Sequence, residues 1–258
     1  MTVPSAATAA SDPQRADRHR SPGSFLAIYR LVLRNQVTAG RIIAVSALGG
    51  LAVLLGLGVR ASDSIDIISD AATLIDQYGL QVVAPVVSLV FASSGLGDMV
   101  DDKTLVYLWL RPTPRIQVAM AAALAALTVC LPAVVVPLVL AAAITGAGPA
   151  LTGGTAVAAA VGVAGYVGMF CAVGIRFRRA LVWGLAYILL WEGFVANASK
   201  TAGRLSLRGY TRSVLSEYTG VGFKQASLSL PVAIVVPILV GGAMIAYAGF
   251  RLSRTDVD

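Results

Sequence analysis

The residues best suited to chemistry in this chain are a few ionisable groups set within or beside long apolar runs. Glu192 is the carboxylate placed well inside such a run, between Trp191 and Gly193. On a helix that began at Leu181 it would lie about 17 Å along the axis. Ionisable side chains inside a membrane usually face a bundle interior, a cavity or a partner charge. Glu192 is therefore a candidate pathway or subunit-interface residue, and the alternative is a carboxyl group that only bonds a neighbouring helix.

A polar segment, residues 98–115, separates two apolar runs and must lie at a membrane surface, because nothing this charged is stable in hydrocarbon. Asp101 and Asp102 favour the start of a short helix, where negative charge is stabilised. The leucines and the tryptophan that follow offer an apolar face that could fill a groove on a partner protein. The alternative is a generic interfacial loop. The candidate contact residues are Asp101, Asp102, Thr104, Leu105, Leu108, Trp109, Pro112 and Arg115.

Charged residues of opposite sign gather in two other predicted loops. Arginines recur every fourth residue in the last long loop, so that on one helix they would form a cationic stripe. Aspartates recur in the first long loop, around a group of isoleucines, and end with Asp76. We expect the two loops to pack together as an outer lid, within or between subunits, and the alternative is that the arginines bind anionic lipid headgroups. The lid candidates are Asp63, Asp66, Asp70, Arg204, Arg208 and Arg212.

The composition places these groups in a membrane protein. The chain has 258 residues, of which 57% are apolar and 13% are charged, and its mean hydropathy is +0.79. Soluble domains carry about 25% charged residues. The net charge of +7 is spread over several loops and forms no basic stretch with interleaved aromatic residues, so nucleic acid is not an expected partner.

Six apolar stretches are long enough to cross a membrane, since a spanning helix needs about 20 residues, with a range of about 17–25. They predict an all-α integral membrane protein with six transmembrane helices. An amphipathic helix over residues 24–36, with Arg30 and Arg34 on its polar side, precedes them as an interfacial elbow. The alternative is that it starts a long first span. The six stretches are residues 42–59, 80–96, 116–144, 155–175, 181–198 and 231–250.

Most lysines and arginines fall on one side of these spans, which predicts that both chain ends are cytoplasmic. We expect a multi-pass protein of the inner (cytoplasmic) membrane with three parts. Residues 1–23 are rich in Ala, Ser, Pro and Arg and are predicted to form a disordered cytoplasmic tail. Residues 24–251 form the six-helix transmembrane domain, and residues 252–258 form a short cytoplasmic C-terminus.

The motifs of several enzyme classes are missing from the sequence. It has no GxxxxGK[ST] segment, so ATP is not expected to bind through a P-loop, and it has neither HExxH nor GxSxG. Its two cysteines lie in apolar runs and lack metal-ligand spacing. We therefore expect this chain to be no enzyme and to hold no metal or other cofactor of its own.

One motif within the polar segment is specific enough to suggest a family. The run Asp101-Asp102-Lys103-Thr104-Leu105, followed by Leu108, Pro112 and Arg115, resembles the acidic-x-G-T-L…L…P…R signature of the coupling segment in permease subunits of ABC-2 type transporters. Lys103 stands where glycine is usual in that family. The pair Trp191–Glu192 is similar to a W-E pair often found in the family's fifth span. The order of elbow, six spans and polar outer segment is similar to the family from Ser24 onward.

This resemblance implies a permease subunit of an exporter in the cytoplasmic membrane, surrounded by membrane lipid. It implies a homodimer, or a heterodimer with a second permease, bound to two separate ABC ATPase subunits that carry the ATP and Mg. Closure of those ATPases would push on residues 101–115 and switch the pathway between inward and outward access. Two other functions stay open at this point: a proton-coupled secondary transporter that uses Glu192, and a non-transporting membrane scaffold or enzyme.

Overall fold

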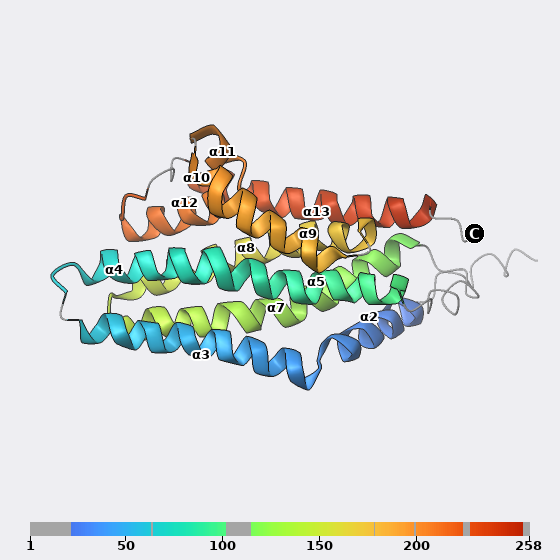
Figure 1. Cartoon of the computed structure of the whole chain (residues 1–258), viewed down its shortest axis with the longest axis horizontal. Helices are drawn as coiled ribbons and strands as arrows, with labels where there is room; N and C mark the ends of the chain where they lie inside the picture. The colour runs from blue at the N-terminus through green and yellow to red at the C-terminus, as the bar shows by residue number, and fades with distance from the viewer. Residues whose placement is uncertain are drawn as a thin grey trace, which may run out of the picture.

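A computed structural model of the chain describes residues 22–62, 64–101, 115–177, 179–198, 200–223 and 228–254. Within these ranges the regular secondary structure is helical, and the helices form an elongated bundle (Figure 1). Five helices are long and apolar enough to cross a membrane. This confirms the all-α prediction and indicates a multi-pass membrane protein. The five cover Ala39–Ala61, Ile67–Ser94, Ile116–Thr145, Pro149–Arg176 and Leu230–Ser253.

The structure agrees only in part with the predicted fifth span. Residues 181–198 are helical, but they form three consecutive pieces whose apolar part, Ala180–Val195, is shorter than the five spans. The sequence turns polar at Asn197, which ends the apolar stretch. The pieces are α9 (Ala180–Ala186), the π-helix η2 (Tyr187–Val195) and α10 (Ala196–Ala198).

Helix α2 (Pro22–Gln36) is amphipathic and separate from the helix that follows it. Val32 is buried against the bundle, whereas Arg34 is exposed. Thr38 has an extended backbone and directly precedes α3 (Ala39–Ala61). The predicted elbow sequence is therefore a helix of its own and is not the start of the first span.

The two predicted tails fall mostly outside the described residues. Of residues 1–23, the structure describes only Pro22 and Gly23, which open α2. At the other end of the chain, α13 (Leu230–Arg254) continues past the predicted domain end to Arg254.

The second span starts well before the predicted residue 80, since three helices follow one another without a break. Asp66 caps the first of them, because its Oδ1 accepts a hydrogen bond from the Ser69 backbone N–H at 3.2 Å. Asp70 and Asp76, which the sequence placed in a loop, are therefore helical. The three helices are α4 (Ile67–Leu74), the π-helix η1 (Ile75–Val83) and α5 (Ala84–Asp101).

A tight turn joins α7 (Arg115–Thr145) to α8 (Pro149–Arg176). Gly146 and Gly148 have φ angles of 77° and 102°, which favour glycine because it has no Cβ. The fourth span therefore starts at Pro149, earlier than the predicted residue 155.

Helix α8 is the centre of the bundle and packs against α5, α7, α13 and α12 (Leu207–Thr219). Its most apolar stretch is 67% buried, whereas those of α3 and α13 are only 17% buried. Most apolar side chains of α3 and α13 therefore point outward, as expected of helices that face lipid. Contact between α8 and α13 is especially close, since a Cβ added to Gly168 would lie 2.3 Å from the carbonyl oxygen of Gly241.

The long polar loop before the last span folds back onto the bundle. It contains α11 (Lys200–Arg204) and α12, which lies along α8. Thr211 packs on Gly162, and Leu207 packs on Gly165. A Cβ added to either glycine would lie 3.0 Å from the side chain that packs on it. Small residues of α8 thus provide the groove that holds α12.

The helix ends that flank the polar segment lie together at one end of the bundle (Figure 1). The start of α2, the end of α5, the start of α7 and the end of α13 lie there, whereas α4 and α12 lie at the opposite end. The bundle therefore has one end that carries the anchors of residues 98–115 and another that carries the acidic and basic loops.

Candidate functional site

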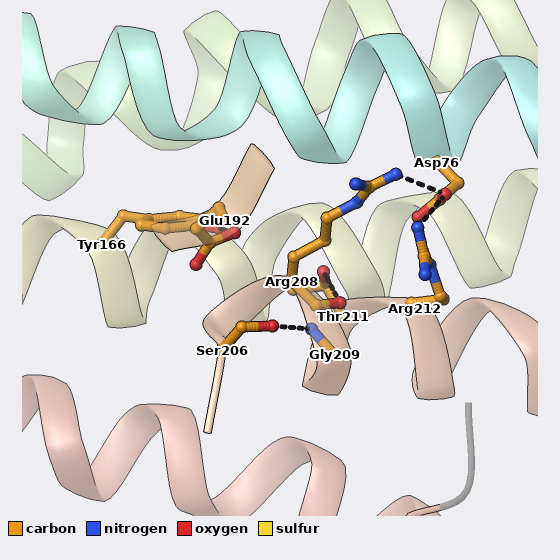
Figure 2. A network of polar contacts seen from close by, with 8 residues as sticks. All are labelled: Asp76, Tyr166, Glu192, Ser206, Arg208, Gly209, Thr211 and Arg212. Atoms are coloured by element: carbon orange, nitrogen blue, oxygen red, sulfur yellow. Dashed lines mark hydrogen bonds and ion pairs between the residues drawn. The ribbon is translucent and has the colours of Figure 1, made fainter. Parts of the chain in front are cut away.

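Two arginines of α12 share one buried carboxylate, that of Asp76 in η1 (Figure 2). Arg212 donates from Nε to Oδ1 at 3.0 Å and from Nη2 to Oδ2 at 2.8 Å. Arg208 donates from Nη2 to the same Oδ2 at 2.8 Å. The three side chains are nearly inaccessible, since Asp76 is 3%, Arg208 5% and Arg212 8% exposed. Such two-point pairing fixes the orientation of both partners as well as attracting them.

A second carboxyl group, that of Glu192 in η2, lies fully buried nearby. The Tyr166 hydroxyl of α8 donates to its Oε2 at 2.6 Å, and the Tyr187 hydroxyl donates to its Oε1 at 3.1 Å. Tyr166 is itself held by a stacked contact with Phe170, at 5.9 Å between ring centroids. Both oxygens of Glu192 are therefore oriented by hydroxyl donors, one from the central helix α8 and one from η2 itself.

The N-terminus of α12 links these two groups. Ser206 caps the helix, because its Oγ accepts a hydrogen bond from the Gly209 backbone N–H at 3.0 Å. The backbone of Arg208, in the first turn, hydrogen-bonds the Glu192 carboxylate. Backbone N–H groups in a first helical turn have no partner within the helix, and they favour a nearby negative group. Arg208 thus contacts Glu192 through its main chain and Asp76 through its side chain.

We refer to Asp76, Glu192, Arg208 and Arg212 as the charge cluster. It brings two acidic and two basic side chains together out of water, and the pairing of Asp76 with both arginines offsets part of the cost of burying them. The cluster holds no arrangement of nucleophile and base, and the described residues contain no group of three or more His, Cys, Asp or Glu that could hold a metal. This arrangement can fasten α12 to η1 through ion pairs and to η2 through a backbone hydrogen bond.

Both acids of the cluster lie in π-helical segments. Asp76 is the second residue of η1, and Glu192 lies within η2. A π-helix widens the turn and changes the direction of its side chains, and such segments are frequent at functional sites. The two π-helices and α12 together position the four charges.

The single arginine stripe predicted over the last loop is wrong. Arg204 ends α11 and is exposed, whereas Arg208 and Arg212 belong to α12 and are buried. The helix breaks between them, because Ser206 is extended and caps a new helix. The spacing of four residues cannot reveal such a break.

The acidic residues predicted to pair with these arginines are not their partners in the described part of the structure. Asp66 and Asp70 are exposed, and Asp66 caps α4. Asp63 lies outside the described residues. The arginines instead contact Asp76, a residue of the acidic loop that is not among the predicted lid candidates. Its position in the sequence could have indicated burial, because Asp76 is the aspartate of this loop nearest to the apolar run that starts at residue 80.

Most candidate contact residues of the polar segment lie outside the described residues. Asp101 ends α5 and Arg115 begins α7, and their side chains are not described. The others that fall outside are Asp102, Thr104, Leu105, Leu108, Trp109 and Pro112.

An apolar groove of about 440 Å³ lies between α3 and α7. Pro132 and Pro137, both inside α7, line it together with Gly49 and Phe91. Prolines within a helix leave carbonyl groups without their usual donors and bend the helix. Ser46 is the hydroxyl-bearing residue of this lining, so the groove suits an apolar chain better than an ion.

Removal of one hydroxyl that donates to the charge cluster tests how much that contact stabilises the fold. We expect Tyr166→Phe to lower the free energy of unfolding by about 1–3 kcal/mol, because it leaves a buried carboxyl oxygen with one donor fewer. Tyr247→Phe, at a residue that is 45% exposed, should have little effect. Unfolding of the purified protein in detergent measures both changes, and equal effects would contradict the expectation.

Comparison with protein-family models and with curated protein sequences finds no match to this chain.

Proposed function

We propose that this chain is the transmembrane permease subunit of an ABC-2 type transporter and that it acts in export. The observation that carries the proposal is the signature in the polar segment between Asp101 and Arg115, which joins α5 to α7. Both anchors of that segment lie at the end of the bundle that also holds the start of α2 and the end of α13 (Figure 1). A segment in that place is available to a cytoplasmic protein while the spans stay in the membrane.

The proposed complex contains two permease subunits, identical or different, and two ATPase subunits that bind ATP and Mg. Both ends of the permease face the cytoplasm, and the membrane is the cytoplasmic membrane. Helix α2 lies at the level of the lipid headgroups, because it packs Ile28 and Val32 against the bundle and leaves Arg30 and Arg34 exposed to them. The helical stretch from Ala180 to Ala198 completes six crossings, which returns the chain to the side from which it started.

The surroundings of Glu192 favour this proposal over a proton-coupled transporter. Its carboxyl oxygens accept hydrogen bonds from Tyr166 and Tyr187, and it lies at the N-terminus of α12. A residue held in this way serves to position helices. A site that loads and releases protons needs access to water, whereas Glu192 is 0% exposed.

Co-purification tests the proposal. We expect the tagged chain, extracted from its native host in mild detergent, to recover a P-loop ATPase in equal amount. A Leu108→Asp, Trp109→Ala variant should lose the ATPase, because it places charge on the apolar face that fills the ATPase groove and removes an aromatic anchor. Mass spectrometry of the purified complexes measures the ratio.

A matched control makes the same apolar-to-acidic change elsewhere. Leu205→Asp alters an exposed leucine between α11 and α12 and should leave the ATPase bound. Recovery of the wild-type chain without any ATPase would contradict the proposal. Loss of the ATPase from both variants would show that the polar segment is not the contact.

A further inference from the structure

Arg208 is the member of the charge cluster that contacts both acids. Its guanidinium does not use all of its hydrogen-bond donors in its present position. Its Nη2 donates to Asp76, but its Nε is buried and has no hydrogen-bond partner among the described residues. A buried N–H group that lacks an acceptor is unfavourable. The position of Arg208 at Asp76 therefore leaves part of its bonding capacity unsatisfied.

Asp76 does not depend on Arg208 for a partner. Arg212 alone contacts both of its carboxylate oxygens, Oδ1 through Nε and Oδ2 through Nη2. Arg208 adds a second contact to Oδ2. If Arg208 moved away, the carboxylate would keep a two-point ion pair.

Glu192 offers Arg208 a second position. The backbone of Arg208 already hydrogen-bonds the Glu192 carboxylate, and its guanidinium is close enough for its charge to act there. Figure 2 shows the Arg208 side chain lying between Glu192 and Asp76. A carboxylate oxygen accepts more than one hydrogen bond, so the contacts of Glu192 with Tyr166 and Tyr187 do not prevent it from pairing with a guanidinium.

We infer that Arg208 is a two-position tether, whose guanidinium alternates between Asp76 and Glu192 and so sets how firmly α12 is held against η1. With Arg208 on Asp76, two arginines fasten α12 to η1. With Arg208 on Glu192, Arg212 alone remains, and α12 separates from η1 more often. Buried ionic contacts suit such a device, because they are specific in geometry without adding much net stability.

The inference rests on the proposed function only for the source of the movement, which would be the ATPase cycle. Its test needs no ATPase. The reporter is Ser213→Cys, on the buried face of α12, where the serine is 3% exposed. The background carries Cys130→Ala and Cys171→Ala, which remove the two buried native thiols. The rate of labelling by a maleimide is measured in lipid nanodiscs, where both sides of the protein meet water.

The two acids should change this rate in opposite directions. Asp76→Asn is expected to raise it about fivefold or more, and Glu192→Gln to lower it by a similar factor, since couplings between sites are commonly 5–150-fold. Glu217→Cys, on the exposed side of α12, should react at the same rate in every background. A rise in both variants, or no change in either, would overturn the inference, because a static clamp loosens whichever acid is altered.

A second comparison covers the case in which Asp76→Asn fails to fold. Glu192→Gln should lower the labelling rate when Arg208 is present and leave it unchanged in an Arg208→Gln background. An equal effect in both backgrounds would show that Glu192 acts on α12 without Arg208. Because these rates are read without ATP, they stand whether or not an ATPase co-purifies with the chain.

Discussion

Replacement of Asp76 by alanine is expected to lower the free energy of unfolding by about 3–5 kcal/mol, which is the cost of removing one partner from a buried ion pair. The substitution leaves the guanidinium groups of Arg208 and Arg212 buried without their shared carboxylate. Such a loss is a large part of the stability of most domains. Thermal or SDS-induced unfolding of the purified chain measures it.

Asp70→Ala is the matched control for this prediction. Asp70 lies in the same uninterrupted helical stretch as Asp76 but is exposed, so its removal should change stability by no more than about 0.5 kcal/mol. If the two variants unfolded alike, the ion pairs of Asp76 would not be holding α12 in the folded protein.

Alanine at Gly168 is expected to destabilise the chain by about 3 kcal/mol, at the upper end of the range for overpacking. The added Cβ would lie 2.3 Å from the oxygen and 2.4 Å from the Cα of Gly241, so that α8 and α13 would have to move apart. These are backbone atoms, which cannot turn aside as a flexible side chain can. Unfolding curves and the yield of folded protein on size exclusion measure the effect.

The same two helices provide controls for the glycine prediction. Gly153 on α8 and Gly242 on α13 have nothing within 4 Å of an added Cβ. Alanine at either position should be neutral or stabilise the chain by about 0.4–1 kcal/mol, because it restricts the unfolded state. A large loss at Gly242 together with none at Gly168 would contradict the described contact between α8 and α13.

The sequence was sufficient to predict the fold class and most spans, because apolar stretches of this length are set by the thickness of the bilayer. The predicted starts were late for two spans. Residues 67–79 contain Asp70 and Asp76, so they do not read as apolar, yet they continue the helix because packing against the bundle buries one side. The length of a helix that contains charged residues near its end depends on tertiary contacts. The average hydropathy of a sequence window carries no information about those contacts.

The charge cluster could be predicted only in part. Glu192, Arg208 and Arg212 stood out as charges in unusual places, but their partners did not. Asp76 meets Arg212 through a π-helix and a separate short helix, and neither leaves a clear pattern in the sequence. Tyr166 contacts Glu192 from another helix of the bundle. The number of residues between them along the chain gives no indication of that contact.

The ion pairs of α12 also constrain how the chain is made. Asp76 precedes Arg208 by 132 residues and Arg212 by 136. At a synthesis rate of about 5–20 residues per second, the aspartate exists for on the order of ten seconds before its partners leave the ribosome. During that interval the carboxyl group of Asp76 has no arginine partner, and the ion pairs can form only after α12 has been synthesised. The first half of this protein is therefore expected to need protection by the insertion machinery until the second half has been translated.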